Sequence, residues 1–152
     1  MLGFLRRGGL SSEQRVDLHE YLRGVRPLSD AAEREFAAWM EAAADSTAKL
    51  ALERDPDGTH AAVYLWRVGE PARQFVQRDP AKGAEHYHEA LALCLEARGA
   101  AAQLFKEATD TASHNNPHAK VKAANEKLGD AQRLLARARI ELRELEARLA
   151  AR

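Results

Sequence analysis

At 152 residues the chain is long enough for one domain with a hydrophobic core and too short for two domains of typical size. The 23 Lys and Arg side chains balance the 23 Asp and Glu side chains, so no net charge draws the protein to nucleic acid or to an acidic membrane. The single cysteine excludes an internal disulfide and fits a reducing compartment, so a cytoplasmic location is expected.

The N-terminus has an apolar start that is too short to act as a membrane segment. The apolar stretch from Met1 to Leu5 is followed by Arg6 and Arg7, which is the reverse of the charge order in a secretory signal peptide. Residues 1–10 are therefore expected to form a flexible tail, and no membrane partner is expected.

The first predicted helix begins at a capping box formed by Ser11 and Gln14. Proline inside a helix removes a backbone donor and crowds the preceding turn. The helix is therefore expected to be short and to end before Pro27. Its apolar stripe consists of Leu18, Tyr21, Leu22 and Val25.

Two further helices are predicted before the middle of the chain. Ser29 or Asp30 caps the second helix, which runs toward the Asp-Pro-Asp-Gly turn signal at 55–58. The third helix starts near Thr59 and contains Pro71, where either a kink or a break is expected. The two apolar stripes are Phe36, Met40, Ala43, Thr47 and Leu50, and Ala61, Leu65, Val68, Ala72 and Phe75.

The C-terminal half predicts a long antiparallel helical hairpin over residues 80–151. Pro80 and Pro117 each follow a capping residue at a first helical position, so a helix begins at each of them. Apolar residues then recur at alternating spacings of three and four, the heptad pattern of packed helices. The pattern allows two pairing registers between the two helices of the hairpin, half a heptad apart. The seams are Ala84, Tyr87, Leu91, Cys94, Arg98, Ala101, Phe105, Ala108 and Ala112, and Val121, Ala124, Leu128, Ala131, Leu135, Ala138, Leu142, Leu145 and Leu149.

Histidine and carboxylate groups give only weak indications of a metal site. Glu85 and His88 have the Glu-x-x-His spacing of di-iron bundles, but the heptad places Glu85 outside the seam and His88 at its margin. His86 and His88 diverge on a helix, and His114 and His118 lack nearby carboxylates or thiols. We therefore expect no metal and no other cofactor.

No motif for catalysis is present, so the protein is not expected to be an enzyme. Cys94 lies on the apolar seam and is expected to behave as a small hydrophobic residue. The aromatic residues of the second and third predicted helices, which include Trp39, Tyr64, Trp66 and Phe75, either line a small-molecule pocket or belong to the core.

Arg98 is the one charged residue in the hairpin seam. A guanidinium group cannot stay unpaired in a dry core. Its stem is expected to lie across Ala131, with its head reaching solvent or an acid such as Asp130.

The end of the hairpin, about residues 101–131, is expected to stand clear of the other helices. The second and third helices are shorter, and the connection to the fourth is predicted to have almost no length. A protruding helical pair with apolar residues is typical of a docking surface, most simply in a two-fold homodimer. The candidate partner-binding residues are Leu104, Phe105, Val121, Leu128 and Leu134.

These patterns together predict an all-α, up-and-down bundle of about five helices over residues 11–152. The expected function is that of a non-enzymatic protein-protein interaction or structural protein that acts through its hairpin. The alternative is a bundle that binds a small ligand or a metal near the aromatic residues of its second and third helices.

Overall fold

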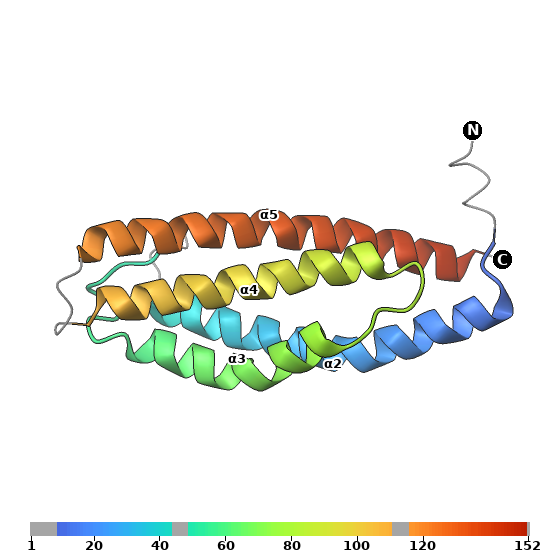
Figure 1. Ribbon diagram of the computed structural model, residues 1–152, viewed down its shortest axis with the longest axis horizontal. Helices are drawn as coiled ribbons and strands as arrows, with labels where there is room; N and C mark the ends of the chain where they lie inside the picture. The colour runs from blue at the N-terminus through green and yellow to red at the C-terminus, as the bar shows by residue number, and fades with distance from the viewer. Residues whose placement is uncertain (1–8, 44–48, 111–115, 152) are drawn as a thin grey trace.

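The computed structural model describes residues 9–43, 49–110 and 116–151 of the chain. These residues form four helices and no strand: α2 (Ser12–Ala43), α3 (Thr59–Gln77), α4 (Glu85–Ala108) and α5 (Pro117–Ala150). The helices run alternately up and down the long axis of the molecule (Figure 1). The all-α class is confirmed, and the expected number of helices was one too high for the described residues. None of their helices is long and apolar enough to cross a membrane.

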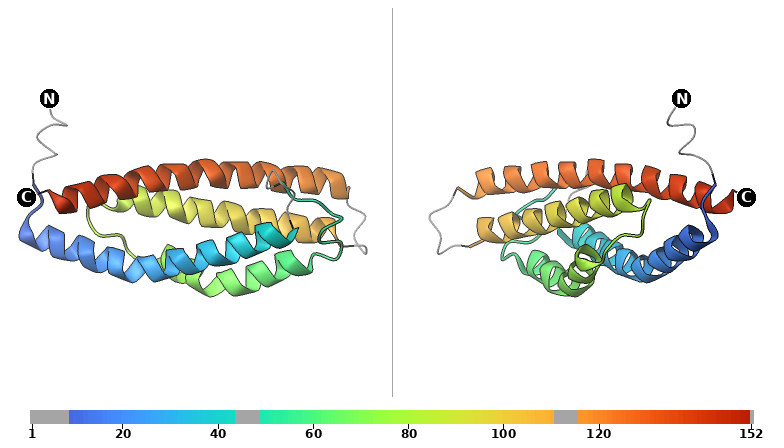
Figure 2. Two further views of the ribbon diagram at one scale, coloured as in Figure 1. Left: turned by 180° about the vertical axis from the view of Figure 1, so that it is seen from behind. Right: turned by 45° about the vertical axis from the view of Figure 1, so that its right-hand side comes forward.

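The first two predicted helices are one continuous helix, α2, with Pro27 inside it. Its capping box is present, because Ser11 N donates to Gln14 Oε1 over 2.9 Å and Gln14 N donates to Ser11 Oγ over 3.1 Å. Figure 2 shows α2 as an unbroken but bent ribbon. Packing explains why the helix continues, since buried side chains on both sides of Pro27, from Leu18 to Ala43, hold it against its neighbours despite the missing backbone hydrogen bond.

Helix α3 likewise continues through Pro71. Its start is held by Asp55, whose carboxylate accepts hydrogen bonds from the backbone N–H groups of His60 and Ala61 at 3.1 and 3.2 Å. Asp55 is only 1% exposed, so the expected turn at 55–58 is also a buried cap for the helix. Gly58 closes this turn at φ 71°, in the left-handed region that favours glycine.

The connection between α3 and α4 is longer than predicted. Helix α4 begins at Glu85 rather than at Pro80, after a loop in which Gly83 adopts φ 98°. The start of α5 agrees with the prediction, because Asn116 accepts hydrogen bonds from the N–H groups of His118 and Ala119, and Pro117 is the first helical residue.

Because the loop before α4 is longer than predicted, α3 lies closer to the closed end of the hairpin. The start of α3 and the residues before it cover this end. Gly58 lies against the end of α4, where a β-carbon on this glycine would collide with the Thr109 hydroxyl. Leu50 is buried there and donates its backbone N–H to Asn125 Oδ1 over 2.8 Å. The expectation that this end stands clear of the bundle is therefore wrong.

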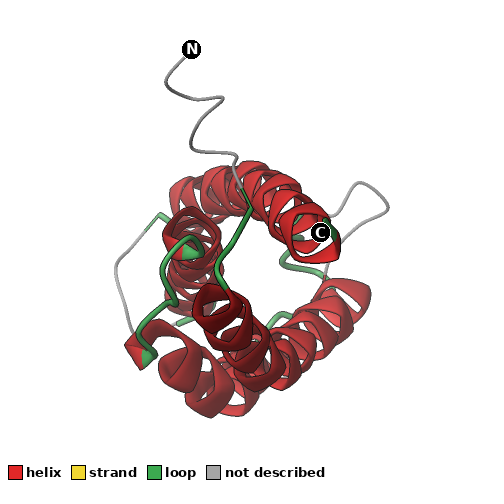
Figure 3. Cartoon of the chain, turned by 90° about the vertical axis from the view of Figure 1, so that its right-hand side faces the viewer, coloured by secondary structure: helices red, strands yellow, loops and turns green. Residues whose placement is uncertain are grey.

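The four helices form a ring when viewed along the long axis (Figure 3). Helix α5 packs mainly on α4, α2 packs on α3, and α3 packs on α4, whereas the backbones of α2 and α5 come close at few points. The predicted seam of α4 is confirmed, since its members from Ala84 to Phe105 are buried. The ring is thus packed along three of its four seams.

Candidate functional site

Helix α5 carries two parallel rows of apolar residues, and only one of them is fully buried. Both rows have the seven-residue spacing that keeps side chains on one side of a helix. The buried row is Ala124, Ala131, Ala138 and Leu145. The second row, which is only partly buried, is Leu128, Leu135, Leu142 and Leu149. Small side chains in the first row let α5 approach α4 closely, while the leucines of the second row border the open seam with α2.

A groove lined by both apolar and polar residues lies along this seam. Its central cavity has a volume of about 360 Å³. From α2 the cavity is lined by Phe36 and Met40, and from α5 by Leu128 and Leu135. Near the C-terminal end of α5 a further cavity of about 580 Å³ reaches Leu149. A third cavity shares Lys49 and Asn125 with the central one but is lined by α5 and the loop before α3, with no residue of α2. The residues that line the three cavities are together called the α2–α5 groove.

Polar contacts cross the groove near both of its ends. At one end Arg15 donates to the carbonyl oxygen of Leu149 over 2.7 Å and to that of Ala151. Arg26 of α2 lies 3.9 Å from Glu146 of α5 at the same end, and this exposed pair is worth little by itself. The Leu50 to Asn125 hydrogen bond lies at the other end. The contacts of Arg15 and Arg26 join α2 to α5, whereas the Leu50 contact joins the loop before α3 to α5.

The groove is more basic than the chain as a whole. Five Lys and Arg residues line its three cavities, against three acidic residues, in a chain whose formal net charge is zero. The basic residues are Arg23, Arg26, Lys49, Arg98 and Lys122, and the acidic residues are Asp30, Glu126 and Glu146. An apolar floor with a mildly cationic border can bind an apolar surface that carries negative charge at its edges.

Arg98 lies in the wall of the groove, and its partner differs from the predicted one. Its Nη1 atom is 2.7 Å from Glu33 Oε1 on α2, and its guanidinium group lies 3.8 Å from the centre of the Phe36 ring. Asp130 instead pairs with Arg133 on its own helix. The side chain of Arg98 is 3% exposed and that of Glu33 is 36% exposed. Arg98 therefore joins α4 to α2, a contact between helices that the hairpin pattern alone does not reveal.

His88 was expected at the margin of the seam, but the structure shows that it is buried. Tyr21 of α2 lies with its hydroxyl group 2.7 Å from His88 Nδ1, and the imidazole stacks on Phe75 at 4.5 Å between ring centres. Burial lowers the pKa of His88, against the opposing effects of a hydrogen bond with the backbone of Val76 and of the Asp79 carboxylate. Burial also raises the pKa of Tyr21. The neutral pair stabilises the contact between α2 and α4.

No metal site emerges from the described residues, which contain no group of three His, Cys, Asp or Glu side chains suited to one ion. His86 is exposed while His88 is buried, so the two do not act together. His114 lies outside the described residues, and His118 borders the groove. Cys94 is fully buried on the seam, and burial raises the pKa of its thiol, which disfavours the nucleophilic thiolate.

The two tryptophans occupy different environments. Trp39 is 2% exposed and stacks on Tyr64 at 4.8 Å, with Phe36 edge-on to both rings. The cavity beside Trp39 has a volume of only about 150 Å³, below the roughly 300 to 1,000 Å³ of typical ligand pockets. Trp66 is 81% exposed on α3 and does not belong to this cluster.

The candidate partner-binding residues are divided between the core, the groove and its surroundings. Phe105 is fully buried. Leu128 lines the central cavity and Val121 lines the cavity beside Lys49, so the structure brings these two to the groove. Leu104 and Leu134 are partly buried against the core. The residues that α2 contributes, Phe36 and Met40, were not predicted, because the sequence does not indicate which helix faces the leucine row of α5.

Comparison of the chain with protein-family models, with curated proteins and with solved structures gives no match.

Proposed function

We propose that this is a non-enzymatic protein-protein interaction protein that binds an amphipathic helix of a partner protein in the α2–α5 groove. One observation carries the proposal: the leucine row of α5, which has heptad spacing and is only partly buried, borders the seam with α2, where the described helices have few close backbone contacts. A helix lying between α2 and α5 would pack its apolar side chains between these leucines, as in a coiled coil. The hairpin then acts through one side of α5 rather than through its closed end.

Charge defines the partner helix further. Five basic residues line the groove, and Glu33, which pairs with Arg98, joins its three acidic ones, so the basic excess is small and a helix with Asp or Glu beside its apolar stripe is the better complement. Lys122 lies at one end of the groove and Arg23 toward the other, so positive charge is present near both ends of a bound helix. Association should accordingly weaken as salt concentration rises.

The test uses a synthetic helical peptide with leucine at the two core positions of each heptad and glutamate at the flanking positions. Fluorescence anisotropy should give saturable binding with one peptide per chain. A peptide with lysine in place of glutamate should bind at least about tenfold more weakly, which corresponds to roughly 1.4 kcal/mol. Light scattering of the same samples separates peptide binding from self-association.

Two variants localise the binding site. Gly129→Phe places a ring at the central cavity, where a β-carbon would meet only the Arg133 side chain at 3.8 Å, so the fold should be kept. Leu128→Glu places a charge among the leucines. Both should lower the affinity by about tenfold or more, whereas Ile140→Glu, at an exposed position of the same helix, should leave it unchanged. Equal binding by all three variants, or no binding of the acidic peptide to the wild type, would contradict the proposal.

A further inference from the structure

The outer face of α3 exposes a tryptophan at its centre. Trp66 is 81% exposed, and Val63, which lies three residues earlier on the helix, is 40% exposed. Isolated apolar side chains on a surface are ordinary, but tryptophan is among the residues most enriched at the centres of protein interfaces. Neither residue lines the central cavity of the α2–α5 groove, so this surface is separate from the site proposed above.

Residues of contrasting size follow one another along this face. Ala62, Trp66, Gly69 and Arg73 are spaced by four, three and four positions, so they form one stripe along the helix. In order, they are small, large, small and large. A β-carbon built at Gly69 would meet nothing within 4 Å, which means that the surface beside Trp66 is open. The indole of Trp66 therefore projects from the helix beside an open space above Gly69.

This alternation is self-complementary, and we propose that the Trp66 face binds the same face of a second copy of the chain. When two α3 helices lie antiparallel about a two-fold axis between Trp66 and Gly69, each large residue meets a small one. Trp66 of one copy covers Gly69 of the other, and Arg73 covers Ala62. No other pairing of these four residues that keeps two-fold symmetry gives every large side chain a small partner.

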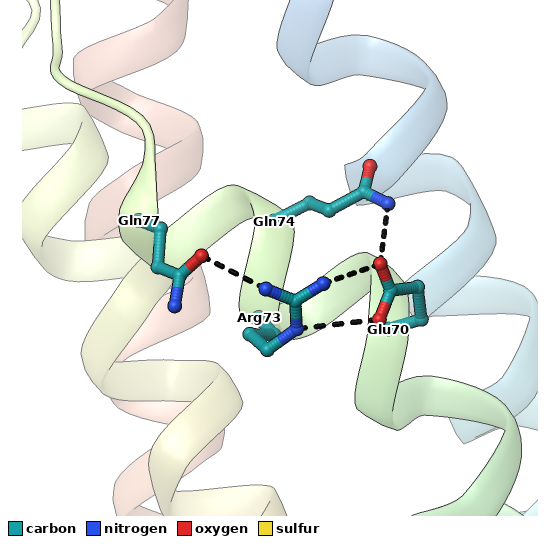
Figure 4. Close-up of polar contacts among 4 residues, drawn as sticks. All are labelled: Glu70, Arg73, Gln74 and Gln77. Carbon is teal, nitrogen blue, oxygen red and sulfur yellow. Dashed lines mark hydrogen bonds and ion pairs between the residues drawn. The ribbon is translucent and has the colours of Figure 1, made fainter.

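The charges on this face are compatible with self-association. Figure 4 shows Glu70, Arg73, Gln74 and Gln77 linked along α3. Arg73 Nε donates to Glu70 Oε2 over 3.2 Å, and Arg73 Nη1 donates to Gln77 Oε1 over 3.0 Å. Hydrogen bonds from Gln74 and from Arg73 lower the pKa of Glu70, so this carboxylate stays charged beside the guanidinium group. One cation and one anion per copy give no net repulsion, and each Arg73 lies beside the indole of the other copy, a favourable cation–π arrangement.

The experiment is sedimentation velocity of the full chain over a dilution series. At about 200 µM the wild type should sediment as a dimer, with twice the 16.8 kDa chain mass, and dissociate on dilution, as small interfaces usually do. Trp66→Glu removes the projection, and Gly69→Leu fills the gap with a good helix former. Both variants should be monomeric with unchanged helix content by circular dichroism.

Gly99→Leu is the matched control, because a β-carbon at Gly99, on α4, also meets nothing within 4 Å. This variant should remain dimeric. The tryptophan emission of the wild type should also shift to shorter wavelength as concentration rises, since Trp39 is already buried and only Trp66 changes its environment. A wild type that stays monomeric, or a dimer that persists in both Trp66→Glu and Gly69→Leu, overturns the proposal.

Discussion

Arg98 and Glu33 form an ion pair between α4 and α2, with 2.7 Å between Nη1 and Oε1. The two partners differ in their access to water, because the Arg98 side chain is 3% exposed and the Glu33 side chain is 36% exposed. The pair is therefore asymmetric. Removing the Glu33 carboxylate leaves a buried, unpaired cation, whereas removing the Arg98 guanidinium leaves an anion that water can reach.

The asymmetry gives the first prediction. Glu33→Ala should lower the free energy of unfolding by about 3 kcal/mol, because it leaves the Arg98 charge buried and unpaired. Arg98→Leu should cost only about 1 kcal/mol, because leucine still packs on Phe36 and Glu33 can be hydrated. Urea denaturation of the two variants measures both values. A larger loss for Arg98→Leu than for Glu33→Ala would show that the guanidinium packing on Phe36, and not the charge balance, dominates.

His88 gives the second prediction, a fall in stability under mildly acidic conditions. Its folded pKa lies below its ordinary value of 6.5, so the unfolded chain binds a proton more readily than the folded chain. The stability that depends on neutral His88 is complete above pH 6.5 and is lost as pH falls from 6.5 toward the folded pKa. The charged or titrating groups nearby are Asp79, which acts on His88, and Tyr87 and Arg78, which act on its partner Tyr21.

Chemical denaturation at pH values on both sides of 6.5 tests this prediction. His88→Gln keeps a hydrogen-bonding group for Tyr21 but removes the titration, so the dependence of stability on pH should become weaker in this range. His19→Gln, at an exposed position, should keep the wild-type dependence. A wild-type pH dependence in His88→Gln would assign the effect to other groups.

The third prediction concerns the cap of α3. Asp55→Ala should lower the free energy of unfolding by about 2 kcal/mol, since it leaves one buried and one part-buried N–H group without their acceptor at the start of the helix. Asp57→Ala is the matched control, because Asp57 is exposed and its hydrogen bonds are local, chiefly with the side chain of Thr59 and with Thr59 N at 3.1 Å. Its cost should be about 0.5 kcal/mol. Thermal or chemical melts giving equal costs for the two variants would disprove the role of Asp55.

The features that local chemistry decides were predictable from the sequence. The capping box at Ser11, the cap at Asn116 and the buried seam of α4 each depend on residues a few positions apart, and all are confirmed. The end of the first helix before Pro27 was predicted wrongly, and of the two outcomes expected at Pro71 the break is excluded, because a proline costs one backbone hydrogen bond locally while the packing that outweighs this cost comes from other helices.

The candidate site was less predictable because it depends on which helices become neighbours. The heptad pattern of α5 predicts that Leu128 and Leu135 are apolar contacts but not that they border a groove. Arg98 in an apolar seam requires an acidic partner, yet many acidic residues could supply it, and the choice of Glu33 follows only from the placement of α2. The length of the loop before α4 decided that the closed end of the hairpin is covered.

The most direct test of the central claim is a map of where the acidic leucine-heptad peptide binds. Backbone amide chemical shifts from heteronuclear NMR should change most for residues around Phe36 and Met40 of α2 and around Leu128 and Leu135 of α5. Amides around Trp66 should change little at concentrations where the protein is monomeric. Shifts confined to α3, or spread evenly over the bundle, would contradict the assignment of the groove as the site of partner binding.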